Sequence, residues 1–89
     1  MKQLQVKIIN KLGLHARAAA KFVTLASEYQ CHVALKHDYK EVNGKSIMGV
    51  MMLAASAGTE LTLIADGEDE QQAIEALTEL INNRFDEAS

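Results

Sequence analysis

Apolar residues in this chain alternate between two spacings, every second residue and every third or fourth, and the order of these patterns restricts the possible folds. At the N-terminus, Leu4, Val6 and Ile8 alternate with polar residues, which predicts a strand with one wet face. Near the C-terminus, Asp69 and Gln72 form a predicted capping pair for a last helix. The predicted elements are a strand at 3–10, a helix from 16, strands at 31–36 and 40–42, a helix at 47–55, a strand at 59–65 and a helix after 69.

This order, β-α-β-β-α-β-α, predicts a four-stranded antiparallel sheet with three helices on one face, because crossovers are right-handed and each strand has one apolar face. The fold class is therefore an open-faced β-sandwich of the α/β (α+β) type. A chain of 89 residues forms one domain, residues 1–89, that can bury a modest core without metal or disulfides. Only residues 86–89 suggest disorder.

Cellular location and metal binding are constrained by what the sequence contains. No segment reaches the length of a membrane span and the N-terminus carries no export signal, so membrane insertion is not expected. The single cysteine, Cys31, cannot form an internal disulfide, which fits a cytoplasmic protein. The spacing of Cys31, His32 and His37 matches no common zinc pattern, so we expect neither a metal nor a cofactor.

A histidine stands where a loop gives way to an alanine-rich helix, in the stretch 13–20. Gly13 permits a tight turn, and the alanines that follow favour a helix, so His15 should lie at or just before its first turn. The unpaired N–H groups of a helix start bind anions, and Arg17 adds a planar cation that disfavours a charged imidazole. The combination points to phosphoryl chemistry at His15.

Charge is divided unevenly along the chain, whose net charge is −3. Residues 1–45 contain eight basic and three acidic residues, whereas the remainder contains one and nine. Lys11, Arg17, Lys21 and Lys45 could give the His15 side of the surface a positive potential that attracts anionic ligands or acidic partners. The alternative is a set of solvated lysines scattered over the surface.

Ser46 is a predicted N-cap for the helix at 47–55, although Gly49 at the third helical position leaves the capping box incomplete. Apolar residues, among them Ile47, Met48 and Met51, run almost all round this helix. One face of a sheet cannot cover all of them. Some should therefore be exposed and serve as a docking surface, a use to which flexible methionine side chains are suited.

Two motifs carry a resemblance that spans essentially the whole chain. Residues 10–17, Asn-Lys-Leu-Gly-Leu-His-Ala-Arg, resemble the phosphorylated-histidine loop of the HPr family, the histidine-containing phosphocarriers of the bacterial phosphoenolpyruvate-dependent phosphotransferase system. Residues 44–51, Gly-Lys-Ser-Ile-Met-Gly-Val-Met, resemble the regulatory-serine helix of that family. The family motif has proline where this chain has Ala18, which leaves one more N–H group in the first turn and puts the rate of transfer in question.

The resemblance implies a carrier that takes a phosphoryl group from enzyme I and passes it to an EIIA-type domain, rather than an enzyme with its own turnover. In that family Nδ1 of the histidine is the nucleophile, so His15 would attack. The backbone N–H groups of Ala16 and Arg17, with the Arg17 guanidinium, would hold the phosphoryl oxygens. The carrier is expected to be a monomer, and the downstream branch, sugar uptake or nitrogen-related regulation, stays open.

Docking and regulation are also implied by the resemblance. The surface that meets partners would include Ala20 of the first helix with Ile47, Met48 and Met51 of the second. Ser46 would be the target of a dedicated kinase, the HPr kinase/phosphorylase, and its phosphate would repel an acidic partner. Capping and phosphorylation are compatible roles for this serine.

Three other functions are alternatives to the carrier. A hydrolase with His15 as general base lacks a nucleophile or an orienting carboxylate nearby in sequence, since most acidic residues lie from Asp66 onward. RNA binding would suit the order of elements, but the aromatic residues supply no stacking pair and the net charge is negative, so no nucleic-acid partner is expected. An unphosphorylated adaptor for regulatory proteins would lose binding on truncation of Met48 or Met51 but not with His15→Ala.

Overall fold

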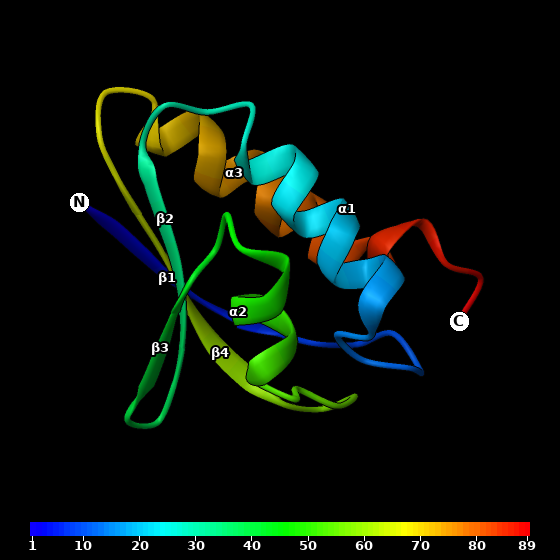
Figure 1. Cartoon of the computed structure of the whole chain (residues 1–89). Coiled ribbons are helices and arrows are strands. Elements are labelled where there is room, and N and C mark those ends of the chain that lie inside the picture. Colours follow the sequence, from blue (N-terminus) through cyan, green and yellow to red (C-terminus); the bar gives the residue numbers. More distant parts are fainter.

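The computed structural model describes all 89 residues and follows the predicted order of strands and helices (Figure 1). The four strands form one antiparallel sheet in the order β1-β4-β2-β3, with the helices on one face, which confirms the open-faced sandwich. No helix is long and apolar enough to cross a membrane. The elements are β1 (Lys2–Lys7), α1 (Ala16–Ala26), β2 (His32–His37), β3 (Lys40–Asn43), α2 (Ile47–Met52), β4 (Glu60–Asp66), α3 (Glu70–Asn82) and the 3-10 turn η1 (Arg84–Asp86).

Strand β4 lies between β1 and β2 and brings the apolar residues of all three into register. Leu63 of β4 pairs with Leu4 on one side and with Leu35 on the other. Leu35 and Leu63 are buried, and Phe22 of α1 and Leu77 of α3 complete the core above them. The apolar alternation that predicted the strands is thus the alternation that faces the helices.

Helix α2 ends at Met52, three residues earlier than the predicted end at Ala55. Ala54 has a left-handed backbone with φ of 51°. The carbonyl of Ala55 then accepts a hydrogen bond of 2.8 Å from the N–H of Leu14. The segment after α2 therefore leaves the helix to support the loop that precedes α1. Gly13 completes this approach, because a Cβ there would overlap the Ala55 carbonyl oxygen.

The predicted cap of α3 by the Asp69 side chain is wrong. Its carboxylate instead accepts the backbone N–H groups of Gln30, at 2.8 Å, and Cys31, at 2.9 Å. These bonds, the one from Gln30 first, lower the pKa of Asp69. The Glu70 carboxylate accepts a hydrogen bond of 3.0 Å from the N–H of Gly67. Asp69 thus ties the start of α3 to the loop between α1 and β2, a tertiary contact that local sequence cannot reveal.

The C-terminal residues 86–89, expected to be disordered, are held against the body of the protein. All three residues of η1 have φ between 53° and 63°, so the chain reverses after α3. This reversal buries Phe85 completely. Beyond it, the carbonyl of Ser89 accepts the N–H of Lys11 at 3.1 Å. The end of the chain consequently lies beside the loop that leads into α1 (Figure 1).

Candidate functional site

His15 is the N-cap residue of α1, as predicted. Its backbone is extended, with φ of −74° and ψ of 177°, and its carbonyl accepts the N–H of Ala19 at 2.8 Å. That bond is the first of the helix, so the N–H groups of Ala16, Arg17 and Ala18 have no acceptor within it. The His15 side chain makes no capping bond. The positive end of α1 is thus left available to an anion next to the imidazole.

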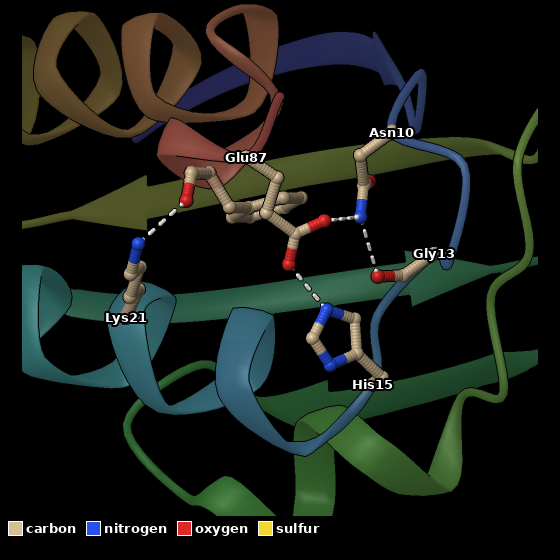
Figure 2. Close-up of polar contacts among 6 residues, drawn as sticks. Asn10, Gly13, His15, Lys21 and Glu87 are labelled. Carbon is tan, nitrogen blue, oxygen red and sulfur yellow. Dashed lines mark hydrogen bonds and ion pairs between the residues drawn. The ribbon is translucent and has the colours of Figure 1, made fainter. Parts of the chain in front are cut away.

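The imidazole of His15 is held by a carboxylate from the other end of the chain. Nε2 contacts Oε2 of Glu87, and Oε1 of Glu87 accepts a bond of 3.0 Å from Nδ2 of Asn10 (Figure 2). The same Asn10 nitrogen donates to the carbonyl of Gly13 at 2.8 Å. Nδ1, on the other edge of the ring, has no partner in the protein and points away from Glu87. The two ring nitrogens therefore have different surroundings.

Glu87 carries a negative charge at neutral pH. The hydrogen bond from Asn10 lowers its pKa most, followed by that from His15, and the nearby positive charge of Lys21 adds to the effect. The side chains of Glu87 and His15 are 15% and 29% exposed, so solvent weakens this pairing without removing it. Glu87 therefore places a negative charge against the Nε2 edge of the imidazole.

A shallow depression of about 670 Å³ opens beside the imidazole, between the start of α1 and the C-terminal residues. His15, Arg17 and Lys21 line it together, as the predicted positive surface requires. Lys45 does not belong to this group. Its Nζ donates to the carbonyl of Tyr29 at 2.6 Å, beyond the far end of α1. The positive surface is therefore smaller than predicted, and the C-terminal acidic residues border it.

Ser46 begins α2 and caps it as predicted. Its Oγ accepts the N–H of Gly49 at 3.0 Å, which satisfies one of the unpaired donors of the first turn. Its side chain is partly accessible. The hydroxyl therefore has a structural role as the cap of α2 and is not sealed from solvent.

The apolar surface of α2 is exposed where it was expected to be. Only Val50 is buried, whereas the side chains of Ile47, Met48 and Met51 are 43%, 72% and 39% exposed. Helix α2 packs on α1, whose Ala20 is half-buried. We call Ala20, Ile47, Met48 and Met51 the docking surface below, after the role that the sequence predicts for them.

Sequence reasoning missed Glu87 and Asn10. The absence of a carboxylate near His15 had counted against an enzymatic role, but Glu87 approaches from 72 positions along the chain, so that ground was wrong. One signal could have shown this. Phe85 continues the apolar stripe of α3 by four residues past Ile81, which predicts that the chain beyond the helix returns to the core.

The open-faced sandwich and the histidine at the start of its first helix fit the class that the sequence resembles, the small phosphohistidine carriers. Residues 2–83 match the family described as "PTS HPr component phosphorylation site". The chain therefore belongs to the HPr family, the phosphocarriers of the phosphoenolpyruvate-dependent phosphotransferase system, and the resemblance found in the sequence is confirmed.

The sequences and structures of relatives align with this chain over most or all of its length. The phosphocarrier protein HPr of Pseudomonas aeruginosa is 60% identical over 88 residues, which cover 98% of each chain. The HPr-like protein Crh of Bacillus subtilis is 56% identical over 86% of this chain and 91% of its own. Among solved structures, HPr-C-His from Thermoanaerobacter tengcongensis superimposes with a TM-score of 0.96, at 47% identity and complete coverage of both chains. A dimeric HPr from the same organism gives a TM-score of 0.79 at 48% identity, covering 98% of this chain and all of the other.

Proposed function

We propose that the chain accepts a phosphoryl group on Nδ1 of His15 from the phosphohistidine of enzyme I and passes it to a histidine of an EIIA-type domain. The observation that carries this proposal is the contrast between the two ring nitrogens. Nε2 is held by Glu87, whereas Nδ1 has no partner in the protein, and the first turn of α1, which follows His15 directly, leaves its N–H groups unpaired. Membership of the HPr family supports the same assignment.

The transfer is a displacement at phosphorus. The Nδ1 lone pair of His15 forms a P–N bond while the P–N bond of the donor breaks and its electron pair returns to the donor imidazole. The N–H groups of Ala16 and Arg17 and the Arg17 guanidinium donate hydrogen bonds to the phosphoryl oxygens and so stabilise their negative charge. Because the depression is shallow and open, a partner's histidine can reach the ring directly. The same surface then serves donor and acceptor in turn.

Partners would meet the docking surface of α1 and α2 next to this corner. Its exposed methionines can repack against different partners, and Arg17 and Lys21 favour acidic ones. A phosphate added to Ser46 by an HPr kinase/phosphorylase would bring negative charge to this surface and weaken such contacts. We infer a cytoplasmic monomer in sugar uptake or in a nitrogen-related branch.

The test is phosphorylation with phosphoenolpyruvate, Mg²⁺ and purified enzyme I, followed by intact mass before and after mild acid. We expect one acid-labile phosphate in the wild type and none in His15→Ala. Arg17→Ala should slow transfer more than it weakens binding of enzyme I, whereas equal losses would make Arg17 mainly a partner contact. A folded protein that binds enzyme I without accepting phosphate would favour the adaptor, whose binding depends on Met48 and Met51 but not on His15.

A further inference from the structure

We propose that Glu87, oriented by Asn10, is a positioning residue that keeps the proton of the His15 imidazole on Nε2 and so leaves the lone pair on Nδ1. This inference rests on the proposed carrier function, for which Nδ1 must be the nucleophile. It goes further because it assigns the choice of nitrogen to a hydrogen-bond chain within this protein. The chain runs from the Gly13 carbonyl through Asn10 and Glu87 to Nε2 (Figure 2).

The direction of this chain is set at its buried end. The Gly13 carbonyl can only accept, so the amide of Asn10 must turn its NH₂ group toward it. The second hydrogen of that group is then directed at Oε1 of Glu87. Asn10 is fully buried, and its Oδ1 receives no hydrogen bond from the protein. Exchange of the amide oxygen and nitrogen would place Oδ1 against two other acceptors, the Gly13 carbonyl and Oε1 of Glu87. Asn10 is thereby fixed as a donor to Glu87.

The other carboxylate oxygen determines the state of the imidazole. An ionised carboxylate has no hydrogen to give, so Nε2 of His15 must donate to Oε2 of Glu87. In the neutral ring the remaining nitrogen, Nδ1, then carries the lone pair. When Nδ1 forms the P–N bond, the proton stays on Nε2 and the ring becomes positively charged. Glu87 would stabilise that charge without taking the proton.

Glu87 can act in this way because the chain is held on both sides of it. Two residues before it, Phe85 is fully buried, and its carbonyl accepts a hydrogen bond of 2.9 Å from Nζ of Lys21. Two residues after it, the carbonyl of Ser89 accepts the N–H of Lys11. The carboxylate is therefore placed by the fold and not by the imidazole alone.

Replacing Glu87 with glutamine separates this role from general loss of charge. In Glu87→Gln the amide oxygen must face the donor Asn10, so the NH₂ group faces Nε2 of His15. Nε2 must then accept, which moves the ring proton to Nδ1 and removes the nucleophile. Glu87→Ala makes neither demand and leaves the tautomer to solvent. The glutamine variant, although closer in shape, should be the worse carrier.

The first measurement is the tautomer, read from long-range ¹H–¹⁵N correlations of the imidazole at about pH 8.5, well above the ordinary titration range of histidine. We expect Nε2–H in the wild type and a shift to Nδ1–H in Glu87→Gln. Asp86→Asn is the matched control, because it removes the same charge from the same segment while its carboxylate contacts Asn83 at 2.8 Å. It should keep the wild-type tautomer.

The second measurement is the rate of phosphorylation by enzyme I. The rate should be about tenfold lower in Glu87→Gln than in the wild type, because one hydrogen bond to a charged group is reversed. It should also be lower than the rate of Glu87→Ala. The proposal is overturned if Glu87→Gln keeps Nε2–H or if Asp86→Asn changes as much. The tautomer needs no phosphate donor. A wild type that accepts no phosphate would therefore refute the carrier function, while the tautomer series would still support or refute the role of Glu87.

Discussion

Phe85→Ala should lower the free energy of unfolding by about 3–5 kcal/mol, the usual cost of removing a phenylalanine from a packed core. Phe85 is fully buried although it lies in the C-terminal turn η1. Its φ of 53° is in the left-handed region. Alanine keeps a Cβ and hence the same backbone strain, so the substitution isolates the packing of the ring. A domain of 89 residues has about 4–13 kcal/mol in total, so the loss is a large share of it.

Urea denaturation followed by far-ultraviolet circular dichroism measures this loss, because the chain has no tryptophan to report by fluorescence. With a slope of about 1 kcal/mol per molar urea, the midpoint should fall by about 3 M or more. Met48→Ala, at a side chain that is 72% exposed, is the control and should stay within about 0.5 kcal/mol of the wild type. A loss below about 1 kcal/mol for Phe85→Ala would refute the conclusion that the C-terminal turn belongs to the core.

Three further predictions concern a helix cap, a tight turn and a tertiary contact of the fold. Ser46→Ala should cost about 1 kcal/mol in urea denaturation because α2 loses its cap, whereas Ser46→Thr should not. Gly13→Ala should cost more than about 1 kcal/mol, since φ is 69° and the new Cβ meets the Ala55 carbonyl; Gly58→Ala, with φ of 93° in open space, controls for strain alone and should cost less. The folded pKa of Asp69 lies below its ordinary value of 3.8, so its contribution is present above that value and disappears as pH falls through the folded pKa. The free energy of unfolding of Asp69→Asn should therefore be lower than that of the wild type at neutral pH, and the difference should disappear in acid. A difference that is independent of pH would show that the charge of the carboxylate is not involved.

Most of the fold could be predicted because its determinants are local. Strand alternation and helical stripes recur within each element, and their order allows few topologies. The end of α2 could not be predicted, because the Ala55 carbonyl is bonded to Leu14 in a distant segment. The hydrogen bonds of Asp69 could not be predicted for the same reason. A side chain at a helix start has both local and tertiary partners available, and only packing decides between them.

Half of the candidate site could be predicted in the same way. His15 and Ser46 each stand at a helix start, and that position alone implies unpaired N–H groups beside them. Glu87 lies beyond Phe85, the last residue of the apolar stripe, and its partner lies at the other end of the chain. Residue spacing cannot show which of several C-terminal carboxylates reaches the imidazole. That choice depends on the left-handed turn that buries Phe85.

Asn10 is the only fully buried polar residue in the protein, and it lies at this site instead of in the general core. Because it donates to both Gly13 and Glu87, Asn10→Ala should cost about 1–3 kcal/mol of stability by leaving buried acceptors unpaired. Its effect on phosphorylation is a separate matter. If Asn10 acts on His15 only through Glu87, then Asn10→Ala should slow phosphorylation in the wild type but add nothing in the Glu87→Ala background. A further slowing in the double variant would mean that Asn10 acts through the Gly13 loop, so that it shapes the backbone before His15 and not the carboxylate.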